Sequence, residues 1–263
     1  AHSIGKTDEN IRSDISCSAG PRIGITKGVF TANEAPCDEC IPMHHEMAQC
    51  LNPPKYVLFY CSEPAQCGGS TPIIKSSDVT KEFKLRFPSC AEKLKEKKIR
   101  YVREFPKDTD MSSPLGKSWK DTFHVNSVKE LNEYLSAHNI QSEWMSNDRL
   151  KTTGPVQDIF ITYKEEELFF TAAETVFRDN PENPSNERPQ KTFIYGDGSQ
   201  LDRDCKNSLY TIGQWAMKNS YKVQWQKHDV LVLYNKTIMH ARENFVPPRK
   251  IMVSLVGSLN DKS

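Results

Sequence analysis

The sequence lacks the features of a membrane-spanning or exported chain. No apolar run approaches the roughly 18 residues needed to cross a bilayer, and residues 1–14 are polar, without the apolar stretch of a signal peptide. The formal net charge is only +1, so nothing suggests a nucleic-acid or anionic-membrane partner. An initiating Met, an internal repeat and a long low-complexity tract are also missing, and we expect a fragment or a processed form.

The composition is typical of a globular enzyme, with 37% hydrophobic and 26% charged residues in a chain of 263. We expect one domain over residues 1–263, with residues 1–20 as a peripheral extension. Eight cysteines could form four disulfides. A chain of this length can build a core without covalent links, so we expect reduced thiols and a cytoplasmic or organellar location.

Short runs rich in β-branched and aromatic residues predict strands. They cover residues 55–61, 99–105, 158–163, 167–171, 229–234 and 250–256. Helices are predicted between them, at residues 78–87, 90–98, 127–138 and 202–219, and residues 180–190 form a loop rich in Pro and Asn. This order indicates a mainly β fold, with a β-sandwich core and inserted α-helices.

The segment PMHHEMA at residues 42–48 contains a possible metal-binding pair. On an extended strand, residues two apart point the same way, so His44 and Glu46 would present an imidazole and a carboxylate together. His240 is the best third ligand, because it follows the strand 229–234 and a short turn. Two histidines and one carboxylate form the facial triad typical of Fe(II) oxygenases. The His-x-Glu pair alone is weak evidence, since each histidine could be an ordinary surface or core residue.

Five segments give a more specific signal. In chain order they read VFTANE at residues 29–34, IPMHHEMAQ at 41–49, GGSTPI at 68–73, GDG at 196–198 and HARENFVPPRK at 240–250. Together they resemble the TauD/TfdA family, and especially its plant clavaminate-synthase-like proteins. The resemblance implies a dioxygenase that depends on Fe(II) and 2-oxoglutarate. It also implies a double-stranded β-helix, or jelly-roll, core whose mouth holds the iron.

The resemblance further implies a reaction and roles for single residues. His44, Glu46 and His240 match the metal ligands, and His45 takes a variable position that is not a ligand. Thr71, in GGSTPI, matches a threonine that helps to bind the co-substrate carboxylate. The enzyme would use 2-oxoglutarate and O₂, release succinate and CO₂, and hydroxylate, desaturate or cyclise a small polar metabolite.

Substrate contacts are expected from loops around the mouth of the core. We place them near Asn33, Phe170 and Thr171. The arginine that grips the anionic substrate in taurine dioxygenase falls at Ser254, which argues against a sulfonate substrate.

The cation for the far carboxylate of 2-oxoglutarate falls within Arg249-Lys250, where the family usually has two arginines. Strand alternation would send Lys250, Met252 and Ser254 to one face and Arg249 to the other. An inward Lys250 would act as a point charge, whereas an inward Arg249 would keep a bidentate fork. We favour Lys250 and keep Arg249 as the alternative.

Two other classes of function compete with the oxygenase. Cys37 and Cys40 have the C-x₂-C spacing of a zinc site, which His44, His45 or Cys50 could complete in an interaction module. That hypothesis leaves His240 and the basic pair unexplained. The third class is an inactive oxygenase fold that serves as a binding protein, favoured only by the lysine at position 250. The sequon at residues 235–237 is interpreted as a chance match, since a glycan there would block the site.

Overall fold

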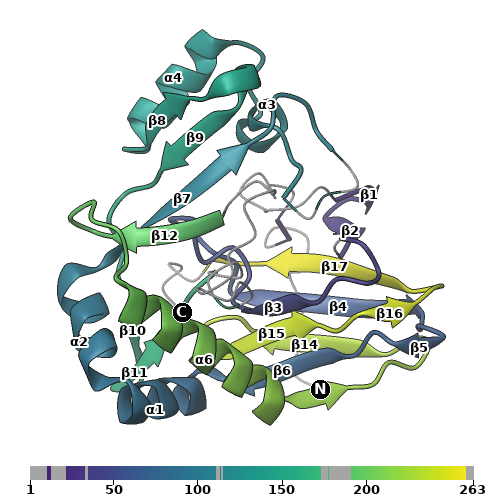
Figure 1. The fold of residues 1–263 in the computed structure, drawn as a ribbon. Helices are drawn as coiled ribbons and strands as arrows, with labels where there is room; N and C mark the ends of the chain where they lie inside the picture. The colour runs from purple at the N-terminus through teal and green to yellow at the C-terminus, as the bar shows by residue number, and fades with distance from the viewer. Residues whose placement is uncertain are drawn as a thin grey trace.

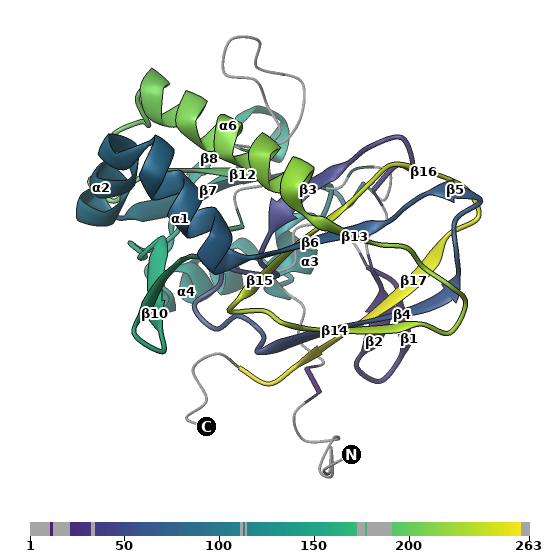
Figure 2. The ribbon, with the colours of Figure 1, turned by 90° about the horizontal axis from the view of Figure 1, so that it is seen from below.

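The computed structural model describes residues 11–12, 22–32, 35–110, 113, 115–172, 177 and 191–258. Two antiparallel sheets lie at the centre of the molecule (Figure 1, Figure 2). The five-stranded sheet has the order β1-β2-β17-β4-β14 and the four-stranded sheet the order β13-β6-β15-β3. The strands of the larger sheet are β1 (Gly24–Thr26), β2 (Val29–Thr31), β17 (Lys250–Val256), β4 (Tyr56–Glu63) and β14 (Val230–Tyr234). Those of the smaller sheet are β13 (Tyr221–Val223), β6 (Thr71–Lys75), β15 (Ile238–Arg242) and β3 (Ile41–His44).

The two sheets enclose an apolar core because their strands alternate between buried and more exposed residues. In β4 and β17 every second residue is buried, as expected for strands with one face in a core. The inward residues of these two strands are Val57, Phe59, Cys61, Ile251, Val253 and Leu255. The strands predicted at residues 55–61, 229–234 and 250–256 are therefore confirmed, with β4 running two residues further.

Helices cover the outer face of the smaller sheet. They are α1 (Ser76–Arg86) and α6 (Arg203–Asn219), and α2 (Pro88–Lys97) packs against both of them. Figure 2 shows α1 and α6 running across this face. Phe83 of α1 and Leu209 and Ile212 of α6 are fully buried in the second core that results. The predicted helices are confirmed, although α1 begins at Ser76 rather than at Asp78 and has no side-chain N-cap.

A third sheet lies at the top of Figure 1. It has the order β12-β7-β9-β8, and α3 and α4 enclose a separate apolar cluster against it. The elements of this region are β12 (Lys191–Tyr195), β7 (Ile99–Phe105), β9 (Leu150–Thr153), β8 (Gln141–Trp144), α3 (Trp119–Phe123), α4 (Val128–Ala137) and the 3₁₀-helix η1 (Ser146–Asp148). Two small hairpins complete the fold, β10 (Phe160–Tyr163) with β11 (Glu166–Phe169) and β5 (Cys67–Gly68) with β16 (Phe245–Val246).

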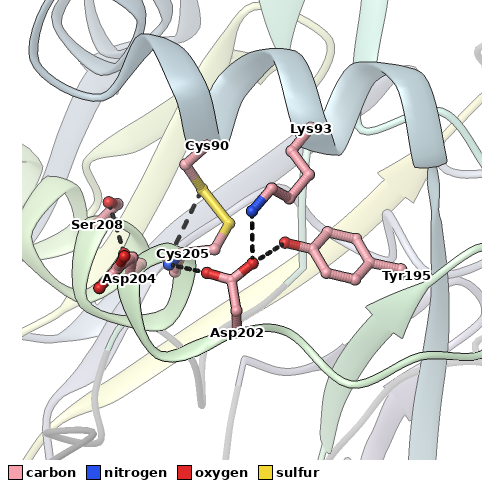
Figure 3. The surroundings of a disulfide bond; sticks show 7 residues. All are labelled: Cys90, Lys93, Tyr195, Asp202, Asp204, Cys205 and Ser208. Carbon is pink, nitrogen blue, oxygen red and sulfur yellow. Dashed lines mark hydrogen bonds and ion pairs between the residues drawn. A yellow bond between two sulfur atoms is a disulfide. The ribbon is translucent and has the colours of Figure 1, made fainter.

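A disulfide joins α2 to α6 and corrects the expectation of reduced thiols. Cys90 and Cys205 are bonded across a Cα separation of 5.2 Å (Figure 3). Asp202 lies beside them as the N-cap of α6 and accepts from the backbone N–H of Cys205 at 2.9 Å. Its other oxygen accepts from Lys93 at 2.8 Å and from the hydroxyl of Tyr195 at 3.0 Å. The bond to Lys93 is the main reason why the pKa of Asp202 falls to about 2.

The fold is mainly β with inserted helices around a jelly-roll core, as expected. Residues 1–10 and 13–20 of the expected extension and the predicted loop at 180–190 lie outside the described residues. Ile11 and Arg12 run beside β17, where Ile11 forms a bridge with Val256. None of the helices in the described part of the chain has the length and apolar character needed to cross a membrane.

Candidate active site

Two histidines face each other on neighbouring strands of the smaller sheet. His44 ends β3 and His240 lies in β15, and the antiparallel register pairs the two residues directly. Their ring centroids are 4.3 Å apart. Glu46 completes the group, with one ligand atom from each residue within 4.8 Å of the others. Within the described ranges no other three His, Cys, Asp or Glu side chains come together in this way.

Glu46 reaches the group from a turn. Strand β3 ends at His44, so the expectation of one extended strand through both residues is wrong. The fully buried Asn235 holds the turn in place. Its Oδ1 accepts from the backbone N–H of Glu46 at 2.8 Å, and its Nδ2 donates to the carbonyl oxygens of Glu46 at 2.9 Å and Pro54 at 3.0 Å. The position of the carboxylate therefore depends on a residue 189 positions away.

Each of the two histidines offers a ring nitrogen as a metal ligand. Nδ1 of His44 donates to the carbonyl oxygen of Pro42 at 2.8 Å, which leaves its Nε2 lone pair for a metal. Burial, and secondly the neighbouring His44, holds the pKa of His240 well below its usual value. Nε2 of His240 lies 3.8 Å from Oε2 of Glu46, a gap that one metal with bonds of about 2 Å can bridge. Two imidazoles and a carboxylate are a donor set that fits Fe(II).

His45 points away from this group. Its Nε2 donates to Oγ of Ser76 at 2.7 Å, and its Nδ1 accepts from the backbone N–H of Thr171 at 3.2 Å. Burial lowers the pKa of His45 to about 3, so the ring is neutral. Phe170 packs on it with ring centroids 4.5 Å apart. Phe170 and Thr171, which we expected at the substrate, belong to this buried cluster and do not line the cavity around the metal group.

An arginine lines that cavity, which we call the metal pocket, at the start of β17. Arg249 shares the lining with His44, Glu46 and His240. Its Nε donates to the carbonyl oxygen of Gly69 at 3.0 Å. A Cβ at Gly69, where φ is +69°, would lie 2.9 Å from Cδ of this arginine, so the GGS motif makes room for the side chain. Burial lowers the pKa of Arg249 to about 10, which leaves a charged but poorly solvated guanidinium.

Thr71 and Trp225 lie together beside this cation. Thr71 begins β6, is buried and lines the metal pocket. Nε1 of Trp225 donates to its Oγ1 at 3.0 Å. The indole therefore fixes the hydroxyl, whose own hydrogen remains available for an acceptor in the pocket.

Lys250 lies outside the metal pocket, so the expectation that it faces inward is wrong. Its side chain is 72% exposed, and Nζ lies 3.0 Å from a carboxylate oxygen of Glu63. The alternation along β17 holds, but the inward set is Ile251, Val253 and Leu255. Arg249 points the same way as this inward set, so it, rather than Lys250, is the cation from this segment that lines the metal pocket.

Arg242, two residues after His240, has a supporting role. Its guanidinium donates to the carbonyl oxygens of Ala35 at 2.9 Å, Pro36 at 2.6 Å and Glu39 at 2.7 Å. These bonds tie the segment 35–39 to β15. The His-x-Arg motif thus combines a metal ligand with a clamp for the neighbouring chain.

Ser254, Cys37, Cys40 and the GDG turn do not line the metal pocket. Ser254 pairs with Leu58 of β4, with the parity of Lys250, and Asn33 lies outside the described residues. Cys37 and Cys40 join no three-residue ligand group in the described ranges, which leaves the zinc alternative without a site there. The GDG turn lies at the end of β12, where the N–H of Gly196 donates to the carbonyl oxygen of Lys97.

Sequence reasoning missed three residues that shape the site. The sequence predicts only a chance sequon at Asn235 and assigns no functional role to Trp225 or Arg22. Arg22 lines the metal pocket and forms an ion pair with Glu46. No local spacing marks these residues, because each reaches the site through a contact that only the fold creates.

A jelly-roll core with two histidines and one carboxylate in its pocket defines the class of Fe(II) oxygenases with a facial triad. Within that class, the chain belongs to the taurine catabolism dioxygenase TauD, TfdA family, whose model matches residues 10–255. It is accordingly a dioxygenase with Fe(II) as its metal and 2-oxoglutarate as its co-substrate.

Two curated relatives are similar over most of the chain. A clavaminate synthase-like protein of Arabidopsis thaliana is 34% identical over 242 residues, which cover 90% of this chain and 71% of the relative. The dapdiamide synthesis protein DdaC of Enterobacter agglomerans is 26% identical over 243 residues, covering 88% of this chain and 69% of the relative. Among solved structures, the PvcB protein of Pseudomonas aeruginosa matches 90% of this chain and 66% of its own, with 13% identity and a TM-score of 0.45.

Proposed function

We propose that this dioxygenase oxidises a small polar metabolite, with His44, Glu46 and His240 holding Fe(II) and Arg249 anchoring the far carboxylate of 2-oxoglutarate. The observation that carries the proposal is the meeting of the three ligands and a buried arginine in one pocket. 2-Oxoglutarate is a dianion that needs a metal at its keto-acid end and a cation at the other. The name of the relative in dapdiamide synthesis supports a small-molecule substrate.

Bound Fe(II) supplies the oxidising chemistry with O₂ as 2-oxoglutarate is converted to succinate and CO₂. The residues of the chain bind and orient the co-substrate and the substrate, and they exclude water from the pocket. Arg249 and the hydroxyl of Thr71 would bind the far carboxylate, which fixes how the co-substrate enters. Phe59 and Ile251 line the pocket as apolar walls, and they keep the charged groups in a medium where each hydrogen bond is stronger than in water. The outcome, hydroxylation or the related desaturation or cyclisation, depends on how the substrate is held.

The decisive experiment is an anaerobic titration of 2-oxoglutarate into Fe(II)-loaded protein. We expect one Fe(II) per chain and a weak visible charge-transfer band from keto-acid chelation. His240→Ala should lose the iron, whereas His228→Ala, which removes an exposed histidine, should not. A folded, iron-loaded protein without the band, or full iron binding by His240→Ala, would contradict the proposal. A metabolite panel scored by succinate release then identifies the substrate.

Three broader expectations belong to the same proposal. Residues 1–263 form one oxygenase domain, which limited proteolysis would test by yielding one stable core. The net charge of +1 supports a small-molecule partner rather than nucleic acid or membrane. A cytoplasmic or organellar location has the free thiols among the described residues in its favour and the Cys90–Cys205 disulfide against it, and tagged protein would reveal the location. These thiols belong to Cys37, Cys40, Cys50, Cys61 and Cys67.

A further inference from the structure

Arg22 reaches the metal pocket from the N-terminal hairpin. It lies two residues before β1, and the chain directly after it is fixed by two bonds between Ile23 and Thr31. The N–H of Ile23 donates to Oγ1 of Thr31 at 2.9 Å, and the N–H of Thr31 donates to the carbonyl oxygen of Ile23 at 2.9 Å. The side chain of Arg22 is only 7% exposed. The hairpin therefore delivers a buried cation to the metal group.

The carboxylate of Glu46 is divided between this cation and the metal position. Nη2 of Arg22 donates to Oε1 at 3.0 Å. The other oxygen, Oε2, is the one that lies 3.8 Å from Nε2 of His240. A metal bound through Oε2 alone can therefore coexist with the ion pair. In that arrangement Arg22 also fixes the rotation of the Glu46 carboxylate.

The second terminal nitrogen of Arg22 has no such partner. Nη1 is buried and forms no hydrogen bond within the described part of the chain. A guanidinium cannot shed this proton at physiological pH, and a buried, unpaired N–H on a charged group is costly. The pocket thus holds a fixed cationic donor beside the metal position, ready for an anionic acceptor.

Under the proposed function, both carboxylates of the co-substrate have partners other than Arg22. One carboxylate of 2-oxoglutarate goes to Arg249 and the other, with the keto oxygen, to the metal. The terminal nitrogens of the third pocket arginine, Arg242, already donate to backbone carbonyls. The remaining candidate is the molecule to be oxidised, which must lie next to the metal.

We propose that Arg22 determines substrate specificity by binding a carboxylate of the substrate through Nη1 while Nη2 holds Glu46. This inference rests on the proposed function and adds that the substrate is a carboxylic acid. The carboxylate would lie close to the metal, so the oxidised carbon is near it in the molecule. Arg22 would supply from the N-terminal hairpin the cation that β17 lacks at Ser254.

The test uses Fe(II)-loaded protein saturated with 2-oxoglutarate under anaerobic conditions. Propionate and benzoate are titrated against their matched amides, propionamide and benzamide, and the shift of the charge-transfer band reports binding. Wild type should bind each acid at least tenfold more tightly than its amide. Arg22→Gln should lose most of that preference, while Arg22→Lys, which keeps the charge, should retain part of it. Lys27→Gln removes a cation from the exposed turn of the same hairpin and should behave as wild type.

The other outcomes overturn the inference in distinct ways. Equal binding of acids and amides by wild type would show that no carboxylate site exists. If both Arg22 variants kept the preference for acids over amides, the carboxylate would be bound by another residue. If Arg22→Gln weakened only 2-oxoglutarate binding, Arg22 would serve the co-substrate, and if it lost only iron, it would serve Glu46 alone. Failure of wild type to form the band would contradict the proposed function itself, and this inference would fall with it.

Discussion

Replacing Arg249 should weaken the binding of 2-oxoglutarate far more than replacing its neighbour Lys250. Arg249 is buried at the metal pocket, and its Nε is already engaged with Gly69. Its two terminal nitrogens are therefore left to form a bidentate pair with a carboxylate. Lys250 carries the same charge one residue later, but it points to solvent and pairs with Glu63. The two alanine variants thus remove one positive charge each from the two faces of one strand.

The expected loss of 2-oxoglutarate affinity in each variant follows from the surroundings of the cation that it removes. A hydrogen bond between charged partners away from water contributes roughly 1.5–3 kcal/mol, which at about 1.4 kcal/mol per decade is roughly a 10- to 150-fold loss of affinity in Arg249→Ala. An exposed ion pair such as that of Lys250 contributes about 0–1 kcal/mol to stability and nothing to a ligand that it does not touch. Arg249→Lys should fall between, since it keeps the charge and loses the fork.

Anaerobic titration of 2-oxoglutarate into each Fe(II)-loaded variant, followed by the charge-transfer band, gives the dissociation constants directly. Thermal melts of the same samples show whether the variants remain folded. If Arg249→Ala bound the co-substrate as wild type does, and Lys250→Ala lost tenfold or more, the pocket cation would be Lys250 and the strand would present its other face in solution. Equal small effects in both variants would remove the anchor from this strand altogether.

Three further perturbations test the support of the site. The pKa of His45 is about 3 in the folded protein and about 6.5 in the unfolded chain. The contribution of neutral, buried His45 to the free energy of unfolding is therefore complete above pH 6.5 and is lost as the pH falls. Between pH 7 and 5, the protonation of His45 should remove about 2 kcal/mol from the stability of metal-free protein, in addition to the loss caused by His240, whose pKa is also lowered. Urea titrations should therefore show a loss about 2 kcal/mol larger in wild type than in His45→Gln, and losses of equal size in the two proteins would refute the assignment. Asn235→Ala should destabilise the protein by roughly 2–4 kcal/mol, because its buried hydrogen bonds to Glu46 and Pro54 disappear. An unchanged melting temperature would show that Asn235 does not stabilise this turn. Breaking the Cys90–Cys205 bond, which spans 115 residues, should lower the free energy of unfolding by roughly 2–4 kcal/mol. Thermal melts of Cys205→Ser and wild type measure this loss, and equal melting temperatures would show that the bond adds no stability.

Most secondary structure could be predicted, because local residue patterns determine it. The helix predicted at residues 127–138 is one example, because Ser127 caps α4 by accepting from the N–H of Glu130 at 3.2 Å. The carboxylate of Glu130 returns to the N–H of Asn126 at 2.9 Å, one residue before the cap. The helix predicted from residue 78 begins two residues earlier, at Ser76. The helix continues directly from β6, where Ser76 is bound through its N–H to the carbonyl oxygen of Thr237.

The prediction of which face of β17 points inward was wrong, although the sequence contains the information needed to predict it. Alternation divides the strand into two sets, and the set with Ile251, Val253 and Leu255 is the more apolar. An apolar set faces a core, so Arg249, with the same parity, points inward and Lys250 points out. If the more apolar set is assigned to the core, Arg249 rather than Lys250 is predicted to point inward. The disulfide and the Asn235 clamp are different, because both join residues more than a hundred positions apart.

The contrast between the two metal-binding segments explains why one motif is weak and the other specific. His44 and Glu46 need only a strand end and a turn, which many sequences provide by chance. The segment that carries His240 must do more, because it begins in β15 of the smaller sheet and ends in β17 of the larger one. On the way it places a metal ligand, clamps the segment 35–39 through Arg242 and delivers Arg249 against Gly69. Each task requires its own residue at its own spacing, so this segment is far more specific than the His-x-Glu pair, and one continuous piece of chain sets the distance between His240 and Arg249.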